Sequence, residues 1–380
     1  MSGLFETGFQ DLEWGNVLML AIGLGLLYLG ISRKMEPLLL LPIGFGVLLA
    51  NIPLTGLMEE TAEGAPTGLI SRIFHFGIGW ELIPPLIFLG LGALTDFRPL
   101  IANPKTFLLG AAAQVGIYFT FFMALLVGKG WLDIFAFDIK EASSIAIIGG
   151  ADGPTTIYLT NALAPHLIGA TAVAAYSYMA LVPIIQPPVI KALTTKEERA
   201  IYMDPQLRPV SNREAILFPI IAALLIVLLV PQSAPLVGMF MLGNLLRASG
   251  VTDRLAQTAS TSFIDVLTIL LGVVVGAQME ADAFLKSETL AIFALGLVAF
   301  AVATAGGVLM GKLMNRLSKE PVNPMIGAAG VSAVPMAARV VQRMGQEANP
   351  HNFLLMHAMG PNIAGIIGSA TAAGLFLGVL

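Results

Sequence analysis

The sequence contains no cysteine and few charged side chains. The absence of cysteine excludes disulfides, thiolate metal centres and a cysteine nucleophile. Charged residues make up 12% of the 380 positions, whereas roughly 25% is typical of soluble domains. The net charge of −4 is small and no basic cluster occurs outside the short polar loops, so we expect no nucleic-acid partner.

The sequence motifs of several enzyme classes are missing as well. There is no Walker phosphate loop, no zinc-binding array of His and Glu, and no arguable Ser-His-Asp arrangement. The first stretch carries Glu6, Asp11 and Glu13 but no basic residue, which is the wrong charge for the start of a cleaved signal peptide. Residues 16–32 are therefore expected to form a retained first helix.

Apolar residues, in contrast, are abundant. They reach 56% of the chain, and about nine windows approach the ~20 apolar residues that span a bilayer. Only helices and closed barrels satisfy their backbone polar groups in lipid. Because the connections are too short for a sizeable soluble domain, the sequence predicts an all-α polytopic membrane protein.

The basic loops predict the topology. Arg33 with Lys34, the loop at 191–213 and the loop at 312–319 carry the basic residues and are expected in the cytoplasm. Spans near 79–97 and 104–128 then run inward and outward, and 166–189 must run inward. No crossing is left for 143–163, which is therefore expected to be a re-entrant hairpin or broken helix that turns at "GGADGPT".

The second half repeats this order with the opposite sense. "NPMIGAAGVSAVP", at 323–335, is again rich in glycine and bounded by proline, but it starts from the cytoplasmic side. "IIGGAD" resembles "MIGAAG", and "APHLIGA" resembles "NPHNFLL" after each turn. Opposed halves that each hold an interrupted helix are typical of inverted-repeat transporters.

The expected division of the chain follows from this pattern. It comprises N-terminal helices at 1–78, a first repeat at 79–190 with its hairpin near 143–163, a basic cytoplasmic loop with connecting helices at 191–259, and an inverted second repeat at 260–380 with its hairpin near 323–345.

Asp152 is the most informative single residue. A carboxylate near the bilayer centre costs at least ~2.5 kcal/mol on insertion scales. One interpretation is a helix cap that accepts backbone N–H groups. The other is a ligand of a monovalent cation such as sodium, together with free carbonyl oxygens and the hydroxyls of Thr155 and Thr156.

Neutral oxygens elsewhere could complete such a site. Asn323 and Ser332 flank the second turn, and Asn362 lies in the further interruption "MGPNIAG". Each asparagine next to proline also fits an ordinary turn or cap. Tyr178 lies mid-span, where its hydroxyl needs a partner, and Tyr176 and Ser177 are alternatives to it.

Other polar residues receive weaker predictions. Gln114, Gln278 and His357 are expected to form helix–helix hydrogen bonds. Arg339 and Arg343, spaced i,i+4, either extend toward the cytoplasm or receive an anionic substrate there.

Two segments carry a resemblance to a known family: "SSIAIIGGADGPTTIYLTNALAPHLIGATAVAAYSYMALVPIIQPP" and "EPLLLLPIGFGVLLANIP". They resemble the β subunit of the sodium-pumping biotin-dependent decarboxylases, which act on oxaloacetate, methylmalonyl-CoA or glutaconyl-CoA. The similarity runs from about residue 15 to the C-terminus. It implies a carboxybiotin decarboxylase that moves sodium outward and consumes a proton.

The resemblance also implies roles for individual residues. Asp152 and Tyr178 match the family's aspartate and tyrosine, and Asn323, Ser332 and Asn362 match its second-half pattern. It implies Tyr178, Asp152 and Ser332 in catalysis, and Asp152, Asn323, Ser332 and Asn362 as sodium ligands. Arg339 and Arg343 would meet the carboxybiotin.

The implied partners are a carboxyltransferase (α) subunit, a biotin carrier subunit that presents carboxybiotin, a small membrane γ or δ subunit, and further copies of this chain, in a prokaryotic plasma (inner) membrane. Two rival classes share part of the pattern. A sodium-coupled carboxylate symporter or sodium/proton exchanger would have the same architecture, whereas a non-catalytic anchor would have no need to bury Asp152.

Overall fold

The computed structural model describes residues 7–61, 64–128, 134–135 and 137–380. Helices account for the regular structure of these residues, and the one β feature among them is an isolated bridge between Glu60 and Pro66. The predicted all-α class is confirmed.

The number of spans is slightly smaller than the sequence windows suggested. Among the described residues, seven helices are long and apolar enough to cross a membrane, or eight if a bent pair counts as one span. That pair joins Leu69–Gly79 to Ile83–Leu94 at 67°. The difference arises because α2 (Pro37–Ala50) has only 14 residues, and because the window at 232–248 is divided between short helical turns and α13 (Met239–Ala248).

The remaining helices follow the predicted order. In the first half they are α1 (Trp14–Ser32), α3 (Leu69–Phe74), α4 (Ile83–Leu94), α5 (Arg98–Ala102), α6 (Phe107–Ala113), α7 (Val115–Val127), α8 (Ile139–Ala146), α9 (Gly153–Leu163) and α10 (Ile168–Leu193). In the second half they are α11 (Lys196–Arg199), α12 (Asn212–Leu229), α14 (Asp253–Thr258), α15 (Ile264–Ala277), α16 (Ala281–Phe284), α17 (Ser287–Leu317), α18 (Met336–Ala348) and α19 (Leu355–Val379).

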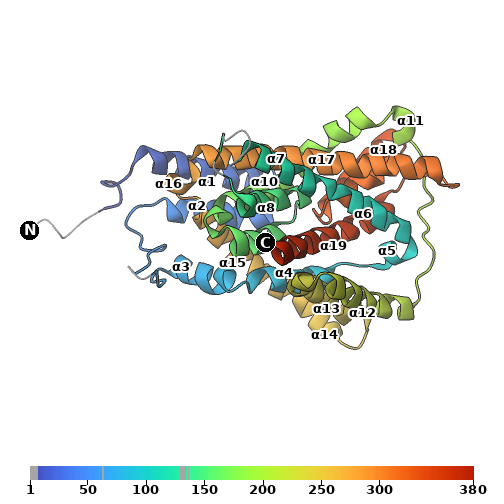
Figure 1. Cartoon of the computed structure of the whole chain (residues 1–380), viewed down its shortest axis with the longest axis horizontal. Coiled ribbons are helices and arrows are strands. Elements are labelled where there is room, and N and C mark those ends of the chain that lie inside the picture. The colour runs from blue at the N-terminus through green and yellow to red at the C-terminus, as the bar shows by residue number, and fades with distance from the viewer. Residues whose placement is uncertain (1–6, 62–63, 129–133, 136) are drawn as a thin grey trace, which may run out of the picture.

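The long helices run along the longest axis of the molecule (Figure 1). The end with α5, α11 and the start of α12 carries the basic connection at 194–211, and the opposite end carries α3 and α16. α17 packs against the helices α6, α7 and α10. α2 packs between α1 and α15, and α4 packs on α13.

Two helices are interrupted where the sequence places glycine and proline. The first break follows α8, which continues as a 3-10 turn over Ile147–Gly150 before α9 begins at Gly153. The second is a 3-10 segment over Pro324–Gly330, called η8 here, followed by a non-helical stretch at 331–335 and then α18. Pro154 and Pro324 stand at the first turns of α9 and η8, where a missing N–H costs little.

The backbone of the second break lies in close contact with the backbone of α17. A Cβ on Gly307 of α17 would lie 2.0 Å from the carbonyl oxygen of Gly327. Only two glycines allow this approach of two backbones, so the helix and the unwound segment are fixed against each other.

We predict that Gly307→Ala lowers the free energy of unfolding by about 1–3 kcal/mol, the usual cost of overpacking. Thermal unfolding of the purified protein in detergent measures the effect. Gly25→Ala in α1 is the matched control, because nothing lies within 4 Å of a Cβ built there and alanine favours helix. Equal transition temperatures for the two variants would contradict the close packing.

Candidate functional site

Asp152 lies at the first break and is 4% exposed. The chain reaches it through Ala151, which is in the left-handed region at φ 52°. Asp152 is the N-cap of α9, and its Oδ1 accepts the backbone N–H of Thr155 at 3.2 Å. The capping interpretation is therefore confirmed, but capping occupies only one of the two carboxylate oxygens.

The second oxygen of Asp152 faces the last helix. Ser369 of α19 donates its hydroxyl to Oδ2 at 2.8 Å, and the Ser369 and Ser332 hydroxyl oxygens are 3.2 Å apart. Within the described part of the chain, no basic side chain forms an ion pair with Asp152. Its charge is thus met by hydrogen-bond donors alone, each worth about 1.5–3 kcal/mol to a charged group.

The two interrupted segments meet at this point. The backbone N–H of Ser332 donates to the carbonyl oxygen of Gly150 at 3.0 Å. This bond joins residues from opposite halves of the chain, and it places the end of the second break beside Asp152.

Amide side chains hold the second break in its unwound form. Gln186 of α10 donates to the Ala328 carbonyl oxygen at 2.9 Å. Asn362 of α19 donates to the carbonyl oxygens of Ala329 and Val331 at 2.9 and 2.7 Å. These bonds replace the helical bonds that the segment lacks, which a buried backbone requires.

Several buried oxygens near the breaks have no hydrogen-bond partner among the described residues. They include the hydroxyls of Thr155 and Tyr176 and the amide oxygen of Asn362. The Tyr176 ring lies against the backbone of Gly153, where a Cβ would approach its Cζ to 2.3 Å. Unpaired buried oxygens are costly, so such a group is suited to a bound cation.

Two predicted residues lie away from this group. Asn323 uses both of its amide protons on the carbonyl oxygens of Arg199 and Ile201, each at 2.9 Å, while its Oδ1 accepts the N–H of Met325. It anchors the start of η8 to the basic connection. Tyr178 donates its hydroxyl to the backbone carbonyl of Phe293 on α17.

Sequence reasoning missed Ser369 and Gln186. Ser369 lies seven residues after Asn362, two helical turns along α19, so the periodicity of that helix gave a usable signal. Gln186 precedes two prolines, and a buried amide there needs a partner that only the fold supplies. The predicted helix–helix role of Gln114 is confirmed by its bond to the Gly365 carbonyl oxygen at 3.3 Å.

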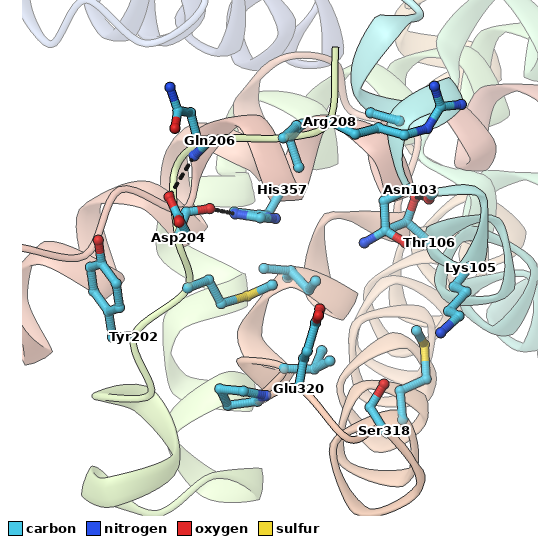
Figure 2. Close-up of a pocket in the computed structure, with 17 residues that line it drawn as sticks. Asn103, Lys105, Thr106, Tyr202, Asp204, Gln206, Arg208, Ser318, Glu320 and His357 are labelled. Atoms are coloured by element: carbon cyan, nitrogen blue, oxygen red, sulfur yellow. Dashed lines mark hydrogen bonds between the residues drawn. The ribbon is translucent and has the colours of Figure 1, made fainter. Parts of the chain in front are cut away.

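Two of the cavities are lined by basic side chains that bear on the proposed chemistry. The larger, about 610 Å³, lies between the 202–208 connection, the connection from α5 to α6 and the end of α17 (Figure 2). His357 stands in its wall, with Nε2 2.6 Å from the Asp204 carbonyl oxygen. The smaller, about 300 Å³, is lined by Arg339 and Arg343 of α18.

The fold and the site define a helical membrane protein with a buried carboxylate between two unwound segments. The described residues contain no group of three or more His, Cys, Asp or Glu side chains that could hold a metal ion. Any cation here would therefore meet one carboxylate and neutral oxygens, a donor set that suits a hard monovalent ion.

Comparison with known proteins identifies the family. Residues 15–380 match the family described as "Na+-transporting oxaloacetate decarboxylase beta subunit". The chain is 56% identical to the methylmalonyl-CoA decarboxylase subunit beta of Propionigenium modestum, covering 98% of this chain and 96% of that protein. It is 55% identical to the glutaconyl-CoA decarboxylase subunit beta of Acidaminococcus fermentans (99% and 96% covered) and 51% identical to the oxaloacetate decarboxylase beta chain of Klebsiella pneumoniae (97% and 96% covered).

The chain belongs to the family of β subunits of sodium-transporting biotin-dependent decarboxylases. Of the classes that the sequence left open, the decarboxylase is therefore correct, and the resemblance noted in the sequence is confirmed.

We predict that Ser369→Ala raises the sodium concentration needed for half-maximal decarboxylation by about 10-fold or more, because a donor to a buried charge is lost. Ser369→Thr keeps the hydroxyl and serves as the control. Sodium titration of the intact complex measures both variants. An unchanged sodium dependence in Ser369→Ala would show that the bond to Asp152 has no part in activity.

Proposed function

We propose that this chain decarboxylates a carboxybiotin presented by a partner subunit and moves sodium outward, with Asp152 as the charged ion ligand. The carrying observation is the Asp152 carboxylate, 4% exposed, at the point where Ser332 joins the two interrupted segments. A buried charge of this kind has a high insertion cost and needs a functional reason.

Sodium is the transported substrate, and the proposed ligands are Asp152, Ser332, Asn362 and Asn323. Asp152 supplies charge, and Asn362 has an unpaired Oδ1 among the described residues. Oxygen donors suit a hard cation. Asn323 lies before η8, away from Asp152, and its amide is bonded to Arg199, Ile201 and Met325, so joining the site would require those bonds to break and the side chain to move.

An inverted repeat would explain how the two breaks come together. In such a repeat α6 would correspond to α17, the first break to η8, and α10 to α19. Two pairs of contacts fit this correspondence. α10 packs on α17 as α19 packs on α6, and α17 contacts the first break as α6 contacts η8. In this proposal α8–α9 and η8–α18 are re-entrant hairpins from opposite sides of the membrane.

Decarboxylation requires a proton at the ligand. When the bond between the ureido nitrogen and the carboxyl group breaks, carbon dioxide leaves and the electron pair stays on nitrogen, which then takes a proton. Tyr178 carries a hydroxyl proton, currently donated to Phe293, and is the proposed source, with Ser332 as the second catalytic hydroxyl.

The carboxylate of the ligand would meet Arg339 and Arg343. Both are exposed, and both line the same cavity. In the complex, a carboxyltransferase (α) subunit and a biotin carrier would deliver the ligand, and a small γ or δ subunit and further copies of this chain would complete the assembly in a prokaryotic plasma membrane. The β-subunit identity of the relatives supports a complex.

We predict that Asp152→Asn abolishes both decarboxylation and sodium transport, because the charge of the ion site is lost. Proteoliposomes with the intact complex, labelled sodium and a carbon dioxide assay measure the two activities together. Asp265→Asn, at an exposed position in the first turn of α15, is the matched control and should retain both. Sodium uptake that survives in Asp152→Asn would exclude Asp152 as the charged ligand.

Tyr178→Phe should separate the two activities. We expect decarboxylation to fall by at least about 100-fold while sodium binding survives, since general acid catalysis contributes typically 10²–10⁴-fold. Tyr176→Phe is the comparison, because its hydroxyl is on the Asp152 side and should affect sodium affinity instead. If Tyr178→Phe turns over normally, the proton comes from another group.

A further inference from the structure

The cavity beside Arg339 and Arg343 holds more positive charge than those two residues supply. It is also lined by Arg33 and Lys34 from the connection between α1 and α2. One carboxylate lines it as well, that of Glu36 from the same connection. Four cations and one anion therefore surround a space of about 300 Å³, the lower end of the range for small-molecule pockets.

The backbone fixes Glu36 at this wall. Its φ and ψ of 32° and 60° are left-handed, and Lys34 is also left-handed at φ 53°. Residues with a Cβ rarely adopt this conformation, because it brings the Cβ close to backbone oxygen. The Glu36 carbonyl accepts the N–H groups of Leu39 and Leu40 and so starts α2.

The side chain of Glu36 does not serve that helix start. Glu36 occupies the N-cap position of α2, yet its carboxylate makes no capping hydrogen bond. Burial raises the pKa of Glu36, and the positive charge of Arg339 partly offsets the rise. Glu36 and Arg339 line the same cavity, so the Glu36 carboxylate lies within the field of this cation, while its own helix end has no side-chain cap.

We infer that Glu36 is a built-in competitor of the ligand's carboxylate for Arg339. In the absence of ligand, Glu36 balances the cationic wall, and an arriving carboxylated ureido ring takes its place. This inference rests on the proposed docking of carboxybiotin at Arg339 and Arg343, and it assigns Glu36 as a positioning residue for that site.

The exchange would link the arrival of the ligand to the interaction between α18 and the connection that joins α1 to α2. Glu36 belongs to the α1–α2 connection, whereas Arg339 belongs to α18, which follows the second break. When the ligand's carboxylate takes the place of Glu36 beside Arg339, the attraction between this connection and α18 becomes weaker.

The test compares Glu36→Gln, Arg339→Gln and wild type in the intact complex, with free carboxybiotin as the probe and initial carbon dioxide release as the readout. We expect Glu36→Gln to lower KM by about two- to fivefold, the range of an exposed ion pair, with little change in kcat. Arg339→Gln should raise KM. Glu36→Asp keeps the charge and should stay near wild type.

Glu347→Gln is the matched control for general electrostatics. Glu347 is an exposed carboxylate on α18 that lies outside this cavity, so its KM should match wild type. An unchanged KM in Glu36→Gln beside a raised KM in Arg339→Gln would overturn the competitor role alone. An unchanged KM in Arg339→Gln would instead overturn the proposed docking site. An equal fall of KM in Glu347→Gln would show that the effect of Glu36→Gln comes from the overall charge of the protein, which would overturn the competitor role.

Discussion

The structure depends on one constraint: a helix that unwinds inside an apolar core exposes backbone groups that must find new partners. The partners here come from across the chain. Ser332 donates its backbone N–H to Gly150, and the side-chain amides of Gln186 and Asn362 bind three carbonyl oxygens of the second break. Each break thus receives at least one hydrogen bond from the other half of the chain, and the second break is also held by Asn362 of its own half.

The charge at Asp152 could be predicted from sequence because its cost is local. A carboxylate between glycines and a proline in an apolar run has few structural explanations, and the two breaks could be located by the same residues. Ser369 carried no such cost, since a serine in a helix can donate to its own backbone, as Ser369 also does to Ile366. Periodicity places Ser369 on the same face of α19 as Asn362, but that this face packs against the first break is visible only in the fold.

Helical periodicity also limited the choice between neighbouring polar residues. Tyr176 and Tyr178 are two positions apart, so they face nearly opposite sides of α10, and the sequence could not say which side holds Asp152. The structure turns Tyr176 toward Gly153 and Tyr178 toward α17. Asn323 was grouped with Asn362 by its place next to a glycine-rich turn, but the fold uses it to hold the basic connection. Shared sequence context therefore did not imply a shared location.

A buried site with one carboxylate and otherwise neutral oxygens has a consequence for coupling. A buried carboxylate is least costly when a single positive charge, sodium or a proton, is bound to it. Two monovalent cations would give the site a net positive charge, and an empty site would keep a net negative charge. With Asp152 as the proposed ion ligand, loss of sodium and gain of a proton would be thermodynamically linked at this side chain. The proposed decarboxylation, which consumes a proton, would draw on the same balance, so chemistry and ion movement would be coupled through the occupancy of one side chain.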